Sequence, residues 1–391
     1  MENCANGFAR IFRMTPKIGI IGAGIGGLGA GLALHRKGFD VQIYERANGL
    51  NEAGAGLSLW PNATGVLKKW ELLEEVMERA AVLKSVELRA WHGKLLAWTD
   101  VIARQSTPTL GMHRAELLSI LRSAFPAERL HLAQGLDRFE IENEELVGHF
   151  AEGTSAMAHT WIGADGLHST VRSEMHGKEI PIYRGYHAHR GITTLAHPLI
   201  EGKAFESWGY GKRFGACPIG RGRVYWYATA NAPRGLRGNP ASWKSDLRHH
   251  FKNWHAPIPA LIDATPEEAL LKHEIFDREP LFEWGRGRIT LLGDAAHPST
   301  PNLGQGACLA LEDADCLSDC LSPELDLPES LRTYEFFRFG RTQRLTLDAR
   351  RLGAIGQWSN PFAVLARNFA IQFLSQSAID KRYTSYFDYG D

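Results

Sequence analysis

The segment spanning residues 17–45 constrains the fold of this chain more than any other. An apolar run, Lys17–Ile21, leads into a glycine-rich turn and an apolar-periodic helix, and a second apolar run ends at Glu45. The turn has the pattern G-x-G-x-x-G, formed by Gly22, Gly24 and Gly27. In such a pattern the first glycine makes the turn, the second admits a pyrophosphate and the third lets helix and strand pack closely. The segment therefore predicts a βαβ unit that binds a dinucleotide, and the acid favours FAD or NAD over NADP because it can hold both ribose hydroxyls.

A second informative stretch covers residues 286–315. Residues 289–292 are expected to form a buried strand that ends at Asp294, and a turn-rich segment follows. A helix is then expected to start near Gly304 and Gly306. Glycines let a ligand touch bare backbone, and the free N–H groups at a helix start favour an electron-rich group. An acid at a strand tip and a glycine-opened helix thus point to a binding site.

This stretch carries a resemblance to a known family. The string GDAAHP at residues 293–298, with P-x-L-G-Q-G at 301–306 and L-E-D-A at 311–314, resembles the second FAD fingerprint of the flavoprotein monooxygenases typified by para-hydroxybenzoate hydroxylase. The turn at Asp165 and Gly166, before a helix capped by Ser169, is similar to the D-G motif of that family. The resemblance extends from residue 17 to about residue 375, with the three motifs in the order of the family.

The resemblance implies how FAD would be held. Asp294 would bind the ribityl or ribose hydroxyls, the loop of Pro301 would lie against the isoalloxazine, and Arg114 in an h-R-x-x-L pattern would contact the pyrophosphate. A backbone group near Leu136 would meet the adenine. The residues so implied are Gly22, Gly24, Ile25, Gly26, Gly27, Glu45, Arg46, Gly56, Arg114, Leu136, Asp165, Asp294, Pro301, Gly304, Gln305, Gly306 and Ala307.

The expected fold class is α/β with α+β elements: a Rossmann-type FAD-binding domain with an inserted antiparallel-sheet substrate domain. Residues 180–284 carry alternating runs rich in Tyr, Trp and Phe, and a hairpin at residues 85–98 is expected to complete their sheet. The predicted FAD domain is discontinuous, covering residues 17–84, 105–179 and 285–360, and the substrate domain covers 85–104 and 180–284. A flexible leader (1–16) and a C-terminal helical tail (361–391) complete the division.

Several local elements are predicted by periodicity and capping. Residues 64–80 and 243–254 have helical spacing, and residues 136–142 and 145–150 suggest a hairpin. Thr265 followed by Pro-Glu-Glu predicts a capping box and a new helix. Residues 361–378 have the spacing of an amphipathic helix that could dock on the domain junction or lie on a membrane surface; docking is favoured because the polar face is not strongly basic.

Candidate substrate residues lie on the aromatic runs. Arg213 and Tyr225, with Arg190 as a further candidate, could face the pocket and favour an anionic, electron-rich substrate; the alternative is that Tyr225 is sheet core and Arg213 is surface. His297 is expected to fix its loop by hydrogen bonds rather than act as a general base. His187 and His189 resemble paired metal ligands, but no third ligand is nearby, so no metal site is predicted.

Composition narrows the class of protein. The chain has 391 residues with 44 basic and 44 acidic side chains, and this balance argues against a nucleic-acid partner. No apolar run is long enough for a membrane-spanning helix, and the five cysteines do not form a disulfide or metal-binding pattern. Residues 1–16 lack the apolar core of a signal peptide, and Met14 is a possible alternative start. A cytoplasmic monomer or homodimer is expected.

The resemblance implies an activity. An FAD-dependent monooxygenase would use NAD(P)H, which visits transiently, and O₂ to hydroxylate a small aromatic or heteroaromatic substrate through a flavin C4a-hydroperoxide. Within the family the chain looks most like alkylquinolone, urate and salicylate hydroxylases, and zeaxanthin epoxidase is a more distant relative. Two alternatives stay open: an epoxidase or tailoring oxygenase acting on a larger apolar substrate, and a flavin-binding redox module without turnover.

Overall fold

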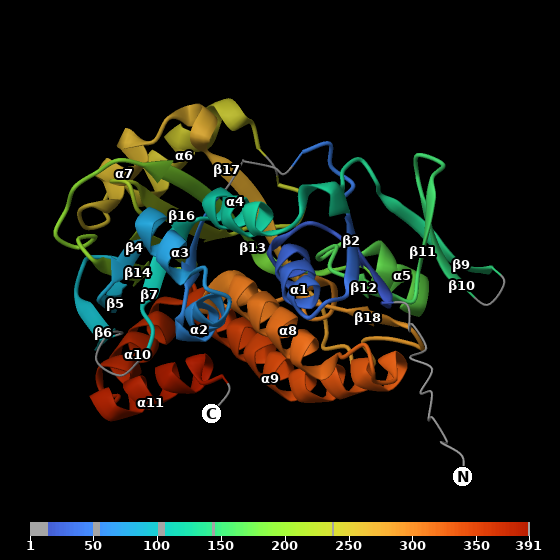
Figure 1. Cartoon of the computed structure of the whole chain (residues 1–391). Coiled ribbons are helices and arrows are strands. Elements are labelled where there is room, and N and C mark those ends of the chain that lie inside the picture. The colour runs from blue at the N-terminus through green and yellow to red at the C-terminus, as the bar shows by residue number, and fades with distance from the viewer. Residues whose placement is uncertain (1–14, 50–54, 101–105, 143–144, 237, 390–391) are drawn as a thin grey trace, which may run out of the picture.

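A computed structural model describes residues 15–49, 55–100, 106–142, 145–236 and 238–389 (Figure 1). All of the predicted leader except Thr15 and Pro16 lies outside the described residues, as does Met14. None of the helices in the described ranges combines the length and apolar character that crossing a bilayer requires.

A five-stranded parallel sheet forms one half of the molecule, in the order β18-β12-β1-β2-β8. Helix α1 (Ile25–Arg36) connects β1 to β2, which confirms the predicted βαβ unit. Helices α4 (Arg114–Ala124) and α8 (Gly306–Cys320) pack on α1, and α5 (Thr170–His176) follows β12. The strands are β1 (Lys17–Ile21), β2 (Asp40–Tyr44), β8 (Leu130–His131), β12 (Thr160–Gly163) and β18 (Ile289–Leu291).

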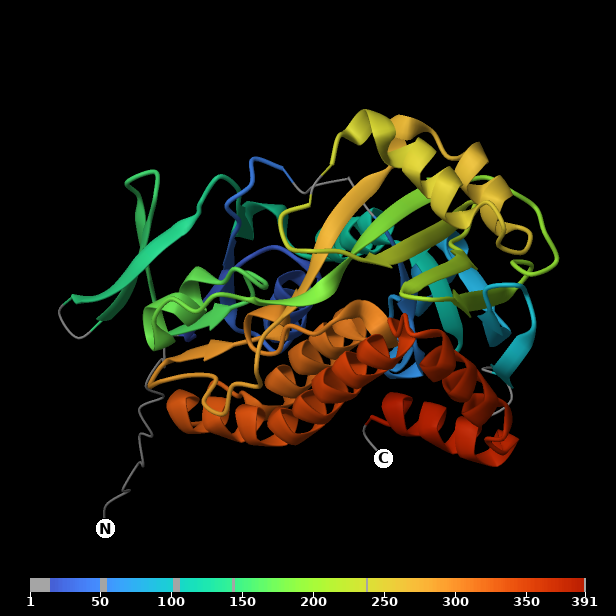
Figure 2. The same ribbon diagram turned by 180° about the vertical axis from the view of Figure 1, so that it is seen from behind.

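A seven-stranded sheet forms the other half, in the order β17-β13-β16-β15-β14-β5-β6. Its far face is covered by α6 (Trp243–Phe251) and α7 (Ile258–Ala264), the yellow helices in Figure 2. The prediction of a wholly antiparallel sheet is wrong at one place, because β14 and β5 pair in parallel. Strand β5 arrives from the other half of the molecule rather than by a hairpin, so its direction is not tied to that of β14. The strands are β5 (Ser85–Ala90), β6 (Leu95–Asp100), β13 (Ile182–Thr193), β14 (Lys203–Trp208), β15 (Lys212–Pro218), β16 (Val224–Asn231) and β17 (Leu271–Asp277).

Two small sheets complete the fold, one beside the seven-stranded sheet and one at the outer end of the parallel-sheet half (Figure 1). The order β3-β7-β4 brings together β3 (Gly56–Leu59), β4 (Ala81–Leu83) and β7 (Thr109–His113). The order β11-β10-β9 contains the predicted hairpin, with β9 (Leu136–Glu142), β10 (Glu145–Phe150) and β11 (Ser155–Ala158). One large apolar core runs through the parallel sheet, α1, α4 and α8, and a second lies between the seven-stranded sheet and the helices α6 and α7.

Two predicted helices differ in the structure. Residues 64–80 form two helices, α2 (Pro61–Lys69) and α3 (Leu73–Arg79), because Glu71 adopts a left-handed conformation with φ 56° between them. Thr265 does not cap a new helix: its hydroxyl donates to the carbonyl of Leu261 and accepts from Trp226 Nε1, and only one 3₁₀ turn, Glu267–Ala269, follows. The buried threonine thus closes α7, and the chain turns directly into β17.

From α8 onward the chain is helical and lies along one side of both sheets (Figure 2). Helix α9 (Leu327–Gly356), 30 residues long, packs beside α8 and was not predicted. The tail is two helices, α10 (Pro361–Gln372) and α11 (Gln376–Phe387), and α11 packs on β6. The prediction that the apolar side of residues 361–378 docks on the protein is wrong, because this side of α10 faces outward: its large apolar residues Phe362, Leu365, Phe369, Phe373 and Leu374 are exposed.

Candidate functional site

Three separated turns meet at one edge of the parallel sheet. Strands β1, β12 and β18 are neighbours, so the turns that follow them lie side by side. Ala164 donates its N–H to Ile21, and a Cβ added at Gly22 would lie 2.5 Å from the carbonyl oxygen of Ala164. Leu292 donates to Gly163 in the same way. The fingerprints predicted near residues 22, 165 and 294 therefore converge, as one extended nucleotide requires.

The glycine-rich turn and the acid after β2 form one unit. The carboxylate of Glu45 accepts from the N–H of Ala23 at 2.8 Å and from that of Ala47 at 3.0 Å. A Cβ added at Gly27 would lie 1.9 Å from the carbonyl oxygen of Gly22, so only glycine allows this helix to start so close to the strand. The predicted role of the third glycine is thus visible in the geometry.

The predicted adenine end lies beside Glu45. Gln134 donates its N–H to the carbonyl of Glu45, and a Cβ added at Gly135 would lie 3.3 Å from Cβ of Arg46. Leu136 follows directly and is buried, whereas Arg46 is exposed. The structure brings these predicted residues together; their contacts with an adenosine stay a prediction.

The side chain of Asp294 is surrounded by protein, but solvent can still reach it. Burial raises the pKa of its carboxyl above the usual range, while the charges of His297 and Arg114 act in the opposite direction. The carboxylate is therefore surrounded by protein but still accessible to a ligand. Arg114, the first residue of α4, is close enough to act on this carboxylate, and its guanidinium has no ion pair within the part of the chain that the structure describes. Arg114 and Asp294 thus lie near each other, as the predicted FAD site requires.

The residues present fit FAD by two further observations. A Cβ added at Gly24, Gly166 or Gly306 would meet nothing within 4 Å, so the backbone of all three motifs faces open space that a ligand can approach. Buried polar atoms lie at the same places: among the described residues, Asp165 Oδ1 and Gln305 Nε2 have no hydrogen-bond partner. FAD carries the hydroxyl, phosphate and carbonyl groups that these donors and acceptors need.

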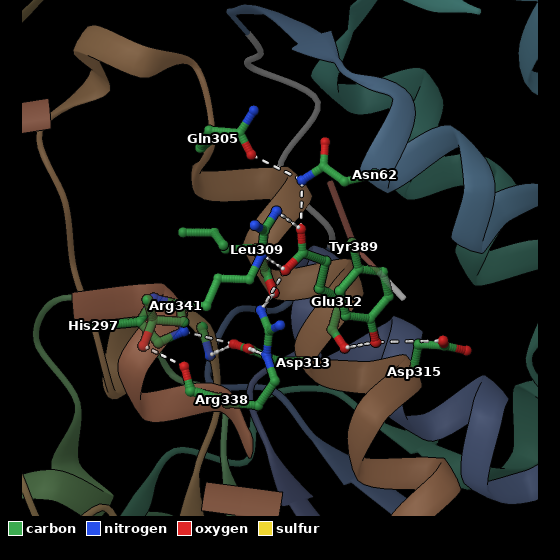
Figure 3. A network of polar contacts seen from close by, with 12 residues as sticks. Asn62, His297, Gln305, Leu309, Glu312, Asp313, Asp315, Arg338, Arg341 and Tyr389 are labelled. Carbon is green, nitrogen blue, oxygen red and sulfur yellow. Dashed lines mark hydrogen bonds and ion pairs between the residues drawn. The ribbon is translucent and has the colours of Figure 1, made fainter. Parts of the chain in front are cut away.

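The loop of Asp294 is anchored by buried charges that link α8 to α9 (Figure 3). Asp313 accepts from His297 Nε2 at 2.6 Å and from the N–H of Gly293 at 2.9 Å, so the histidine fixes its loop as predicted. Arg338 on α9 pairs with Asp313 and with Glu312, both at 2.7 Å. Burial alone would raise the pKa of Asp313, but the charges of His297 and Arg338 hold it at about 2.

Sequence reasoning missed the two arginines of this network. Arg341 forms two hydrogen bonds with Glu312, and Asn62 donates to both Glu312 and Gln305 (Figure 3). The signal that could have identified them is the pair of adjacent acids in L-E-D-A on an apolar helix, because buried carboxylates need cationic partners. The arginines at positions 338 and 341 are the partners.

Arg213 lies on β15 of the seven-stranded sheet, and its side chain reaches Asn302 and Gln357. Its three nitrogens bond to Gln357 Oε1 at 2.9 Å, Glu206 Oε1 at 3.1 Å and Asn302 Oδ1 at 2.7 Å. Its guanidinium also lies 5.5 Å from the ring centroid of Tyr186. Arg213 is 2% exposed, so the alternative that it is a surface residue is wrong.

Tyr225 and Arg190 are neighbours on β16 and β13. Burial raises the pKa of Tyr225 to about 12, and the charge of Arg190 acts against this rise. A Cβ added at Gly56, at the start of β3, would lie 2.4 Å from Cβ of Tyr225. The tyrosine therefore sits where the FAD-side loop meets the aromatic sheet, and its contact with a substrate stays a prediction.

The histidine pair of β13 lies away from this site. The rings of His187 and His189 are 5.1 Å apart, and His189 packs against Trp243 of α6. Burial is the main cause that lowers the pKa values of His187 and His189, to about 4 and about 3, so both are neutral at physiological pH. Neither belongs to a cluster of three candidate metal ligands among the described residues.

Comparisons with known proteins agree with this geometry. The FAD binding domain family matches residues 15–347. The aurachin C monooxygenase/isomerase of Stigmatella aurantiaca is 37% identical over 366 residues, covering 93% of this chain and 95% of that protein. An FAD-dependent urate hydroxylase of Klebsiella pneumoniae is 31% identical, covering 85% and 88%. The crystal structure of Klebsiella pneumoniae HpxO with FAD and uric acid superposes with a TM-score of 0.90 at 29% identity, covering 96% and 97%. The chain therefore belongs to the FAD binding domain family and is an FAD-dependent flavoprotein monooxygenase.

Proposed function

We propose that the chain uses NAD(P)H and O₂ to hydroxylate a small, uncharged aromatic or heteroaromatic ring. The ring would lie between the turn Pro301–Leu303 and the seven-stranded sheet. FAD, when bound, supplies the redox chemistry between NAD(P)H and O₂. The observation that carries the proposal is the side chain of Asn302, which bonds to both Arg213 and Tyr186. This contact joins the loop expected beside the isoalloxazine to the aromatic strands.

The partners of Arg213 support an uncharged substrate. Glu206 is half-buried and provides a counter-charge, and the remaining donors point to Asn302 and Gln357. An anionic substrate at this position would compete with a carboxylate that is already in place, and separating a partly buried ion pair has a cost in free energy. Arg213 is therefore proposed to position the pocket rather than to bind a carboxylated ring.

Side chains from three elements would orient the ring and exclude water. Tyr225 stays protonated at physiological pH because its pKa is about 12, so its phenol can donate a hydrogen bond. Trp60 stacks on Phe387 of α11 with ring centroids 4.4 Å apart, and Tyr383 packs against both. An apolar wall of this kind protects a reactive oxygen species from loss to water.

The relatives support the reaction class. One relative is named as a monooxygenase/isomerase and another as a urate hydroxylase. The HpxO structure contains uric acid, a compact heteroaromatic ring. We also propose a cytoplasmic monomer or homodimer with the domain boundaries predicted above. The contacts of the FAD residues named in the sequence are part of the same proposal.

A substrate panel tests the function. NADH and NADPH consumption would be measured with phenols, quinolones, purines and carboxylated arenes, and product mass would be recorded. We expect uncharged rings to stimulate consumption and to gain one oxygen atom. Preference for carboxylated arenes would contradict the uncharged class, and a yellow protein that oxidises no NAD(P)H with any ring would favour a module without turnover.

Replacing Arg213 with alanine is expected to raise KM or the uncoupled fraction of NAD(P)H oxidation by at least about tenfold, because charge-assisted bonds that hold the pocket are lost. The matched control is Lys212→Ala on the same strand, since Lys212 points to the opposite face and contacts His250. Flavin content checks that both variants fold. Unchanged KM and coupling in Arg213→Ala would reject this role.

A further inference from the structure

The strongest unexplained surface of the molecule is the outward side of α10. Phe362, Leu365, Phe369, Phe373 and Leu374 are 82%, 70%, 62%, 73% and 54% exposed. They recur at helical spacing, so they form one apolar stripe along the helix and the turn that follows. Soluble proteins rarely expose contiguous apolar patches of this kind without a partner.

The stripe continues onto its surroundings. Trp358 and Ile355, which directly precede α10, are 41% and 38% exposed. Tyr210 is next to Gly211, which donates its N–H to the carbonyl of Trp358, and Trp98 accepts from Gln376 through its carbonyl. Both aromatic residues are nearly half exposed. We call this set of exposed residues around α10 the apolar platform.

Within residues 355–374, which form most of the apolar platform, no charged side chain is exposed. Between Arg351 and Lys381 the charged residues are Arg367 and Asp380, and both side chains are buried. Arg367 turns inward to the carbonyls of Ile355, Gly356 and Gly209. Arg367, the one cation of α10, thus holds the helix against the rest of the protein. The outer side of the helix is left without a charged side chain.

Basic residues stand at both ends of this stretch. Arg351 precedes the apolar platform on α9, and Lys381 and Arg382 follow it on α11, all three exposed. Anionic lipid headgroups attract cations placed at the rim of an apolar face. An interface with a protein partner would instead be expected to contain hydrogen bonds between the two proteins, about one per 100–200 Å² of interface. The exposed side of α10 offers such bonds only through Gln372.

We propose that the apolar platform docks this enzyme on the surface of a lipid bilayer that contains anionic lipid. Helix α10 would lie flat in the interface with its phenylalanines among the acyl chains. With 12 residues the helix is roughly 18 Å long, well short of the roughly 30 Å hydrocarbon core, so it lies on the membrane and does not cross it. Interfacial aromatics such as Trp358 and Trp98 suit this depth.

The test uses the full-length, FAD-loaded chain and sedimentation with vesicles of phosphatidylcholine, with and without phosphatidylglycerol. We expect the protein to pellet with the anionic vesicles. The triple variant Phe362→Ser, Phe369→Ser, Phe373→Ser should partition at least about tenfold less, because buried apolar area is the main attraction. Flavin content and thermal midpoint should match those of the wild type, since these side chains contact little of the protein.

The matched control is Phe336→Ser with Phe337→Ser on α9. These residues are 80% and 61% exposed and lie roughly 30 Å along the helix from its end at Gly356. The control should bind vesicles like the wild type. Equal partitioning of wild type and triple variant, equal loss in the control, or failure of the wild type to bind would overturn the proposal. A wild-type dimer that the triple variant converts to monomer, without vesicle binding, would identify the platform as an interface between copies and also overturn it.

Discussion

Replacing Arg338 with methionine is expected to lower the free energy of unfolding by about 3–5 kcal/mol, because it leaves two buried carboxylates short of a partner. Arg338 is 2% exposed and pairs with Asp313 and Glu312. The measurement is urea unfolding at neutral pH. The FAD content should fall as well, since Asp313 also holds Gly293 and His297 in the loop of Asp294.

The same variant has a defined dependence on pH. Asp313 has a folded pKa of about 2, below the value of about 3.9 expected in an unfolded chain. The stabilisation is therefore fully present above about pH 4 and is lost as pH falls towards 2. The difference between wild type and Arg338→Met should shrink over that window. Arg351→Met is the control on the same helix, because Arg351 is exposed and its pair with Asp348 contributes little. A similar loss in both variants would show that the buried network is not the cause.

Replacing Gly24 with valine is expected to weaken FAD binding by at least about a hundredfold while the fold is kept. The backbone of Gly24 has φ −72°, which any residue adopts, and an added Cβ would meet nothing within 4 Å of the protein. The side chain would instead occupy the space that the pyrophosphate needs, as the second glycine of such a motif predicts. The measurement is the dissociation constant for FAD, with circular dichroism to confirm the fold.

Gly65→Val provides the matched control for this experiment. Gly65 lies inside α2, and an added Cβ there also meets nothing within 4 Å. Valine has a slightly better helix propensity than glycine, so stability should change little. The control should bind FAD like the wild type. Unchanged affinity in Gly24→Val would mean that the nucleotide does not run past this turn.

The elements that carry the motifs could be predicted from sequence because local patterns determine them. The strand–turn–helix at residues 17–36, the hairpin of β9 and β10, and Ser169 as the cap of α5 were all expected and found. Each depends on neighbours within a few residues: apolar period, glycine at a turn, or a hydroxyl before a helix. The convergence of the three turns followed from the family resemblance, and the structure shows its cause: β1, β12 and β18 are parallel neighbours that end at the same edge.

Other features depended on contacts between distant segments. The sequence around Thr265 matches a capping box, but its hydroxyl forms hydrogen bonds with Trp226 and Leu261 instead of capping a new helix. The apolar spacing of α10 could not tell whether its stripe would face the protein or solvent, since a buried Arg367 on the other side decides the orientation. Arg338 and Arg341 stabilise the fold by pairing with acids 25 and 29 residues away in the sequence. The periodicity of a helix does not reveal such distant pairs.

Helix α9 sets the distance between the loop of Asp294 and the side chain of Arg213. Arg338 fixes the loop of Asp294 near the middle of the helix, and Gln357, its C-cap, fixes Arg213. These points are 19 residues apart, a rod of roughly 28 Å. Inserting a single residue between them would rotate one anchor by about 100° relative to the other. Insertions or deletions in this segment are therefore tolerated only in steps that restore the helical phase. The spacing between residues 338 and 357 thus fixes both the distance and the relative rotation of the two anchored regions.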